Sequence, residues 1–363
     1  HNHYKFWSRC SEPYQFLAFC FEWEEFVNQG KREEGFITHL PCFSDCTNSG
    51  LQIFAGVLKD EVGGKATNLT NEETPQDVYQ EVADKTLEYL DKMEDSQLKK
   101  MWLEYKINRK TTKKITMCVV YGLTQYSCRA YIQEHLEDMV EEGKPCPFMK
   151  NKEDAEKTGI PSVFQATYYL SKLVWKAISD VIISAKECMI WLQKVSRLVS
   201  DNGLPVTFTT PTGYQVQMNY RQMKKQRVNT RMGESMKTKK VTIQYETNKI
   251  DKRKVSNAIS PCWIHALDGS ILAKAVSKAS SRGIKSFATV HDSFGVLAPD
   301  VQLMNDCVRE SFVEIFSREN VLQNFCKEIT PQIAKEKRHL IPELPKMRNL
   351  DIAEVLKSKY FCS

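Results

Sequence analysis

The stretch TVHDSFGVLA, residues 289–298, constrains the fold of this chain most. A charged pair, His291-Asp292, stands between two short apolar runs, and the second run stops at Pro299. Short apolar runs around a brief polar break predict a β-hairpin with the polar residues at the turn. Aspartate is common in turns, so the pattern alone does not assign a function to Asp292.

A second strand pattern lies far away in the sequence. Residues 36–44, FITHLPCFS, predict a buried strand, and Asp45 follows it directly. The segment after Asp45 predicts a turn and then a helix that ends at Gly63-Gly64. Asp45 and Asp292 therefore both stand at the ends of predicted strands, and only the fold can bring them together.

Most of the remaining chain has helical periodicity, above all residues 71–194. The most hydrophobic segment, residues 173–192, carries charged side chains at amphipathic spacing and predicts a core helix. No apolar run reaches the roughly 18 residues of a membrane span, so we expect no membrane partner. The expected fold class is α+β, mostly helical.

The twelve cysteines are scattered, without a Cys-x-x-Cys pair or histidines at zinc-ligand spacing. This usage predicts free thiols in a reducing, intracellular compartment. The net charge of +6 is mild for 363 residues, so any nucleic-acid surface must come from local clustering.

One segment supplies such a cluster. Residues 221–257 contain twelve Lys or Arg and only three acidic residues. A charge run is often just a solvated face, but this one contains apolar residues in strand-like alternation. It therefore favours a basic β-ribbon beside nucleic acid. Residues 204–218, LPVTFTTPTGYQVQM, predict another hairpin around a Thr-Pro-Thr-Gly turn.

Two carboxylates at neighbouring strand ends can hold two Mg²⁺ ions, which prefer hard oxygen ligands. Such ions would activate a 3′ hydroxyl and stabilise the leaving pyrophosphate in a phosphoryl transfer. Asp45 and Asp292 are the candidates for this metal site.

The segment RKTTKKITMCVVYG, residues 109–122, is the third candidate element. Arg109, Lys113, Met117 and Tyr121 recur every four residues and line one stripe of an α-helix, roughly 18 Å long. The two cations could bind a triphosphate, and the Met and Tyr side chains could support a base and sugar. The ordinary alternative is a basic helix face with a buried Met and Tyr.

Three motifs follow one another along the chain. They are D-x-x-x-S-G at residues 45–50, R-x-x-x-K-x-x-x-M-x-x-x-Y-G at 109–122, and HDSFG at 291–295. Together they resemble motifs A, B and C of the single-subunit DNA-dependent RNA polymerases of phages and mitochondria. The resemblance runs from FLAFCFEW near residue 16 to the aromatic tail YFCS. It implies DNA-templated RNA synthesis by two-metal-ion nucleotidyl transfer.

The resemblance implies a role for each aspartate. Asp45 and Asp292 would bind the two metal ions. Cys46 stands where phage enzymes usually have a glycine that lends a backbone carbonyl to the metal, and a carbonyl survives that substitution.

The same resemblance implies the nucleotide site. Lys113, assisted by Arg109, would bind the triphosphate and donate a proton to pyrophosphate. Tyr121 would close over the incoming nucleotide and, with His265 in WIHALDGS, sense its ribose 2′ hydroxyl. His291 would lie against the primer terminus.

The basic ribbon falls where phage relatives insert a promoter-reading hairpin into the major groove. Arg227, Asn229, Lys237 and Lys239 occupy the reading positions, so Arg–guanine and Asn–adenine contacts are expected. The lysines differ from the more usual Arg and Gln, which leaves the promoter sequence open.

The implied architecture is a right-hand polymerase palm and fingers with a small antiparallel palm sheet. We expect palm at residues 1–73, fingers at 74–264 with a basic hairpin at about 204–257, and a second palm segment with the aromatic tail at 265–363. The family's N-terminal domain and thumb are missing from this sequence. We therefore expect the catalytic C-terminal part of a longer or split polymerase, with those parts in cis or on a separate chain.

The implied partners are template and promoter DNA, nascent RNA, NTPs and transcription initiation factors. The letters VVYG and the aromatic tail resemble the organellar enzymes of the family and therefore favour the mitochondrial matrix. HDSFG suits phage enzymes equally, so the cytoplasm of a phage-infected cell is the alternative.

Two other functions compete with RNA synthesis. A right-hand DNA polymerase would carry a bulky glutamate where Gly50 stands and HDE in place of His291-Asp292-Ser293. An inactive polymerase-derived scaffold that binds nucleic acid or proteins would fit the missing domains. It gives no physical reason, however, to retain both aspartates and the whole stripe.

Overall fold

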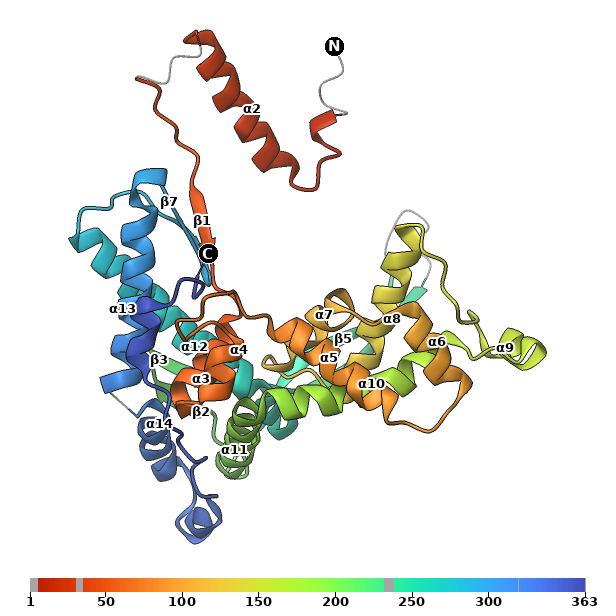
Figure 1. The fold of residues 1–363 in the computed structure, drawn as a ribbon. Helices are drawn as coiled ribbons and strands as arrows, with labels where there is room; N and C mark the ends of the chain where they lie inside the picture. Colours follow the sequence, from red (N-terminus) through yellow and green to blue (C-terminus); the bar gives the residue numbers. More distant parts are fainter. Residues whose placement is uncertain (1–5, 31–34, 232–237, 319, 363) are drawn as a thin grey trace.

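The computed structural model describes residues 6–30, 35–231, 238–318 and 320–362. Helices dominate this part of the chain and the sheets are small and antiparallel, which confirms the expected mostly helical α+β class. Figure 1 shows a body of helices with a small sheet at its upper end, a helical arm to one side, and helix α2 (Pro13–Asn28) apart from both. None of the side chains of α2 is buried.

The sheet that carries both aspartates has three strands in the order β1-β7-β6. These strands are β1 (Cys42–Asp45), β6 (Ala288–Val290) and β7 (Ser293–Val296). Strands β6 and β7 form the predicted hairpin, with His291-Asp292 as its two-residue turn. The prediction of a buried strand over residues 36–44 was wrong, because β1 begins only after Pro41 and is an edge strand that pairs on one side.

Helix α3 lies in the interior of the body, and its ten residues are all buried. The helices of the body are α3 (Ser49–Leu58), α4 (Glu61–Ala66), α11 (Ile183–Ser200), α12 (Lys252–Ser281), α13 (Val301–Arg318) and α14 (Val321–Ile329). The single helix predicted up to Gly63-Gly64 is two helices, because Lys59 takes a left-handed conformation that ends α3. Helix α12 packs against α3, α11 and α13 and so lies at the centre of the body.

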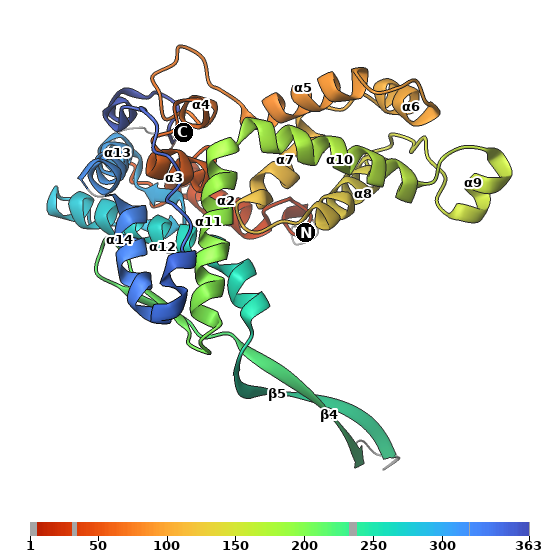
Figure 2. The ribbon, with the colours of Figure 1, turned by 90° about the horizontal axis from the view of Figure 1, so that it is seen from below.

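The arm is a group of helices that extends to one side of the body (Figure 2). It consists of α5 (Val78–Asp91), α6 (Gln97–Tyr105), α7 (Arg109–Val119), α8 (Gln125–Glu141), α9 (Lys152–Thr158) and α10 (Val163–Val181). Helices α7 and α10 each pack against both α5 and α8. The core helix predicted over residues 173–192 is divided between α10 and α11 by a break at Ile182.

Two separate two-stranded sheets occupy the region of the predicted hairpins. They are β2 (Val206–Thr209) with β3 (Gln215–Met218), and β4 (Arg221–Arg231) with β5 (Thr238–Ile250). The hairpin predicted at 204–218 is confirmed, and the β4-β5 ribbon projects from the body in Figure 2. The basic ribbon is shorter than expected, because Asp251 caps α12 and residues 252–257 are helical.

Four short 3-10 turns complete the C-terminal part: η1 (Ala298–Asp300), η2 (Thr330–Gln332), η3 (Lys335–Leu340) and η4 (Ile352–Lys357). Among the described helices, none combines the length and the apolarity that crossing a bilayer requires.

Candidate active site

The antiparallel pairing of β1 with β7 brings the two aspartates together. Asp45 ends β1 opposite Ser293, the residue that follows Asp292. The Cys46 amide donates a hydrogen bond to the Asp292 carbonyl over 3.3 Å. His291 takes φ +53° in the two-residue turn, which lets the hairpin reverse directly at these residues.

The glycine of HDSFG is explained by packing. Gly295 lies between Phe43 on β1 and Ala288 on β6. A Cβ atom at this position would lie 2.4 Å from the Ala288 carbonyl oxygen and 2.6 Å from the Phe43 ring. Only glycine therefore lets the three strands pair at the register that aligns Asp45 with Asp292.

Helix α7 presents the predicted stripe. Its other face is buried, and Asn108 and Thr111 form a capping box at its start. Arg109, Lys113 and Met117 are exposed on the open face. Tyr121 is not part of the helix, as the stripe had implied, because α7 ends at Val119 and Gly122 takes a positive φ. It still lies on the same side of the molecule.

A single cavity of about 700 Å³ joins these elements. Its walls include both aspartates and all four residues of the stripe, which are Asp45, Asp292, Arg109, Lys113, Met117 and Tyr121. Cys46 also lines it, as do Asp77, Tyr79 and Tyr360. The structure thus brings together residues from both ends of the chain and from the helical arm.

The electrostatics of this cavity favour a bound cation. Burial raises the pKa of Asp45, the nearby Asp292 raises it further, and Lys113 opposes both effects. Two carboxylates that disfavour each other's charge are stabilised by a cation between them. No cluster of three or more His, Cys, Asp or Glu residues placed to hold a metal occurs among the described residues. Mg²⁺ still fits, because it is usually held by one or two carboxylates together with substrate phosphates.

Three aromatic rings stand next to one another at the edge of the site. The rings of Tyr121 and His265 are stacked, with centroids 5.0 Å apart and 10° between their planes. His265 also faces His291, at 6.2 Å between ring centroids. Burial lowers the pKa of His265, and His291 lowers it further, so a neutral imidazole is favoured. Of the two histidines predicted from the sequence, His265 stacks on Tyr121 and His291 lies beside His265.

Asp268 is a carboxylate that the sequence analysis missed. It is buried on α12, one turn after His265, and burial together with the nearby Asp292 raises its pKa to about 7. The sequence did contain a signal for Asp268. It stands three residues after His265, and residues at positions i and i+3 share one face of a helix.

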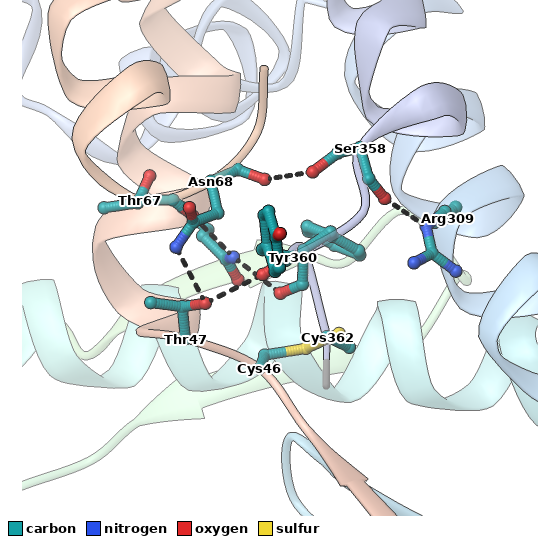
Figure 3. Close-up of a disulfide and its surroundings, with 10 residues drawn as sticks. Cys46, Thr47, Thr67, Asn68, Arg309, Ser358, Tyr360 and Cys362 are labelled. Atoms are coloured by element: carbon teal, nitrogen blue, oxygen red, sulfur yellow. Dashed lines mark hydrogen bonds between the residues drawn. A yellow bond between two sulfur atoms is a disulfide. The ribbon is translucent and has the colours of Figure 1, made fainter. Parts of the chain in front are cut away.

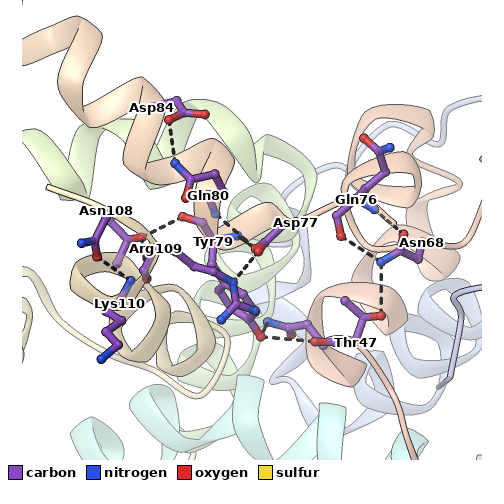
Figure 4. Close-up of polar contacts among 12 residues, drawn as sticks. Thr47, Asn68, Gln76, Asp77, Tyr79, Gln80, Asp84, Asn108, Arg109 and Lys110 are labelled. Carbon is purple, nitrogen blue, oxygen red and sulfur yellow. Dashed lines mark hydrogen bonds and ion pairs between the residues drawn. The ribbon is translucent and has the colours of Figure 1, made fainter. Parts of the chain in front are cut away.

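Arg109 is held by partners that the sequence analysis also missed (Figure 4). Its guanidinium forms an ion pair with Asp77 and lies over the Tyr79 ring, 5.1 Å from the centroid. Asp77 caps the N-terminus of α5, and the Tyr79 hydroxyl donates a hydrogen bond to the Thr47 carbonyl over 3.2 Å. An aspartate directly before an amphipathic run is a capping signal, but nothing in the sequence links Asp77 to Arg109.

The C-terminal tail contributes Tyr360 to the wall of the cavity, and Figure 3 shows the hydrogen bonds that hold the tail in place. The Thr47 hydroxyl donates to the Tyr360 carbonyl over 3.0 Å, and Gln52 donates to the Phe361 carbonyl over 3.0 Å. The Ser358 hydroxyl donates to the Asn68 carbonyl over 2.7 Å. These bonds join the last residues of the chain to the segment that follows Asp45.

The structure corrects the expectation that every cysteine is a free thiol. Cys46 and Cys362 form a disulfide across this contact, with Cα atoms 4.1 Å apart (Figure 3). Spacing could not predict the pair, because 316 residues separate the two cysteines and only the fold makes them neighbours. The other ten cysteines are free. The disulfide uses the Cys46 sulfur, so a metal role for this residue is restricted to its backbone.

The disulfide leads to a stability prediction. We expect a reductant to lower the melting temperature of the oxidised wild-type chain and to leave Cys362→Ser unchanged. Disulfides typically contribute about 2–4 kcal/mol, chiefly by restricting the unfolded chain. Thermal melts with and without a phosphine reductant measure this, and Cys42→Ser is the control because Cys42 is exposed and free. Equal melting temperatures for the oxidised and reduced wild type would contradict the prediction.

The predicted DNA-reading residues lie on the projecting ribbon, away from the cavity. Arg227 and Asn229 pair with Thr242 and Lys240, so by register these four residues share one face. Lys239 pairs with Thr230 in the same ribbon, and Val241, Ile243 and Tyr245 belong by register to the face opposite Arg227 and Asn229. Lys237 lies outside the described residues.

Comparison with known proteins identifies the same family that the motifs resemble. The family model for DNA-dependent RNA polymerase matches residues 1–340. The chain is 29% identical to the DNA-directed RNA polymerase of Enterobacteria phage T3, over 98% of this chain and 43% of the phage protein. It is 32% identical to the mitochondrial DNA-directed RNA polymerase 1 of Arabidopsis thaliana, over 98% of this chain and 34% of the plant protein. The chain therefore spans less than half the length of these relatives.

Proposed function

This chain belongs to the DNA-dependent RNA polymerase family, and from that membership we propose that it carries the catalytic centre for DNA-templated RNA synthesis. The observation that carries the proposal is the single cavity lined by Asp45, Asp292 and the α7 stripe. It offers a pair of carboxylates at one end and two cations beside a flat Met and Tyr surface at the other.

In the proposed reaction, Asp45 and Asp292 would hold two Mg²⁺ ions, which when bound would neutralise charge on the attacking 3′ hydroxyl and the leaving pyrophosphate. Arg109 and Lys113 bind the triphosphate, and Lys113 donates a proton to pyrophosphate. Arg109 is already oriented by Asp77 and must exchange this partner for phosphate oxygens. His291, in the turn beside Asp292, contacts the primer terminus.

We assign the domains accordingly. Residues 1–73 and 265–363 form the palm, and residues 74–264 form the fingers, which include the helical arm and the ribbon. The relatives carry more than half of their own length outside the matched segment. We propose that these parts, in cis or on a second chain, supply the grip on the duplex, and that initiation factors assist. Because relatives include mitochondrial enzymes, we propose the mitochondrial matrix as the compartment.

The ribbon would read promoter DNA. Lys225, Arg227, Asn229, Arg231 and Lys240 lie on one face by register, a basic and amide-bearing surface suited to phosphates and base edges. Lys239 belongs to the same ribbon, and we propose it as a further DNA contact.

Selection of ribonucleotides gives a prediction about Tyr121. A Cβ atom at residue 50 would lie 2.7 Å from Val120 and 3.4 Å from the Tyr121 hydroxyl, so a bulky side chain there cannot exclude a 2′ hydroxyl without a shift in packing. Selection must then come from a hydrogen-bonding site that a deoxynucleotide leaves unsatisfied, at a cost of about 1–3 kcal/mol, or roughly five- to 150-fold. We expect Tyr121→Phe to retain RNA synthesis and to lose most of this discrimination.

The measurement is kcat/KM for a matched rNTP and dNTP pair in wild type and Tyr121→Phe. Tyr214→Phe is the control, because Tyr214 is exposed in the β2-β3 turn. An unchanged ratio would remove Tyr121 from the selecting site even if the polymerase assignment stood.

The proposed function itself is tested with the complete protein on a promoter-bearing template. Ribonucleotide incorporation that requires both Mg²⁺ and template supports it. Template-dependent synthesis from dNTPs alone would favour the DNA polymerase alternative, and template binding without incorporation would favour the scaffold.

A further inference from the structure

The outer face of the arm carries exposed aromatic rings, which we call the aromatic ladder: Tyr126, Phe164 and Tyr168. Tyr126 stands at the start of α8, and Phe164 and Tyr168 stand one turn apart on α10. Their side chains are 75%, 59% and 49% exposed. Three large aromatic rings exposed side by side are unusual on a soluble surface and indicate an interaction site.

Cations connect the rings of the ladder. The Arg129 guanidinium lies 5.8 Å from the Tyr126 centroid and 4.9 Å from the Phe164 centroid. Phe164 and Tyr168 are nearly parallel, with 3° between their planes and centroids 6.3 Å apart. The Lys172 ammonium lies 4.3 Å from the Tyr168 centroid. The ladder therefore combines two nearly parallel rings, a third ring and two cations.

A row of exposed side chains runs along α10. Phe164, Tyr168, Lys172 and Lys176 follow one another at four-residue spacing, all exposed, over roughly 18 Å. Lys176 lies 4.2 Å from the centroid of Tyr89, a ring from α5. At about 3.4 Å per nucleotide, this length matches about five stacked nucleotides of one strand.

A pocket of about 450 Å³ borders the ladder. Tyr168 and Lys172 form one wall, and Leu98, Ile160 and Pro161 contribute apolar surface. The charged side chains at its rim are Lys152, Lys172 and Glu156, of which Lys152 and Glu156 form an ion pair of 3.5 Å. A pocket of this size and lining can accept a single nucleobase beside the ring of Tyr168.

We propose that the ladder binds single-stranded nucleic acid, with bases stacked on Phe164 and Tyr168 and phosphates paired with Arg129, Lys172 and Lys176. Alternating rings and cations are the surface that such strands need, because every base has a π-face and every linkage a negative charge. The ladder begins at Tyr126, five residues after Tyr121, which lines the candidate active site. The inference goes beyond the proposed function, and its test requires no nucleotidyl transfer.

The test is equilibrium binding of a fluorescent oligothymidylate of 20 nucleotides to the full chain, followed by anisotropy. The variant Phe164→Ala with Tyr168→Ala should bind at least about fivefold more weakly, since each stacked ring contributes that much or more. Tyr214→Ala is the control, because this ring is 71% exposed but has no cation beside it among the described contacts. Both rings of the variant are exposed, so its melting temperature should match that of the wild type.

Cross-linking locates the strand independently. A 5-bromouracil oligonucleotide should cross-link to peptides that contain Phe164 and Tyr168, as identified by mass spectrometry. Unchanged affinity in the double variant, or cross-links confined to the β4-β5 ribbon, would overturn the proposal. Either result would leave RNA synthesis at the cavity untouched, because the cavity shares no residue with the ladder.

Discussion

Asp292→Asn should fold normally and lose RNA synthesis by roughly two to three orders of magnitude or more. Asparagine keeps the size and the turn preference of aspartate at this position in the hairpin but removes a charged ligand. The remaining carboxylate of Asp45 would then face a metal alone, so charge development at the leaving pyrophosphate would lose its stabilisation. Asp45→Asn should behave in the same way, because Asp45 ends the neighbouring strand.

Single-nucleotide extension of an RNA primer by the complete protein in Mg²⁺ measures this effect. Asp300→Asn is the matched control, because Asp300 stands in the 3-10 turn after the same hairpin and does not line the cavity. Near-normal extension by either Asp45→Asn or Asp292→Asn would show that the two aspartates do not form the metal site.

Lys113→Ala should lower kcat by about 10²- to 10³-fold, the scale for one cation directed at transition-state charge. The side chain stands on the open face of α7, in the cavity that also contains both aspartates. If Lys113 donates a proton to pyrophosphate, the loss must appear in the chemical step and not only in binding.

Pre-steady-state kinetics separate the two effects, and Lys114→Ala is the control. Lys114 is the next residue on α7 but pairs with Glu134 on α8, at 2.6 Å. A rise in KM with unchanged kcat would show that Lys113 contributes only to binding of the ground state. It would exclude Lys113 as the proton donor and leave that donor unidentified.

Local patterns were sufficient to predict two elements of the site, the hairpin and α7, but not the bounds of β1. Apolar alternation around His291-Asp292 predicted the hairpin, and four-residue spacing predicted the open face of α7. Both patterns involve residues that are close in the sequence, and the spacing of side chains over such short segments follows directly from the geometry of the backbone. The end of α7 before Tyr121 was missed, because periodicity continues past the point where Gly122 stops the helix.

Contacts between distant segments could not be predicted in this way. The pairing of β1 with β7, the disulfide and the tail over Thr47 all depend on how α3 and α13 pack in the body. No local pattern specifies such packing. The ion pair of Asp77 with Arg109 is similar, since each residue alone is an ordinary helix-end residue.

The most direct test of the catalytic centre is the position of bound metal. Crystals of the complete protein with template, primer, a non-hydrolysable NTP and Mn²⁺ should give two anomalous scattering peaks between Asp45 and Asp292, beside the triphosphate. Crystals of the Asp292→Asn variant, prepared with the same ligands, should show at least one anomalous peak fewer at this site. Mn²⁺ bound elsewhere, with nucleotide in the cavity and no peak at either aspartate, would contradict the assignment of this sheet edge as the catalytic metal site.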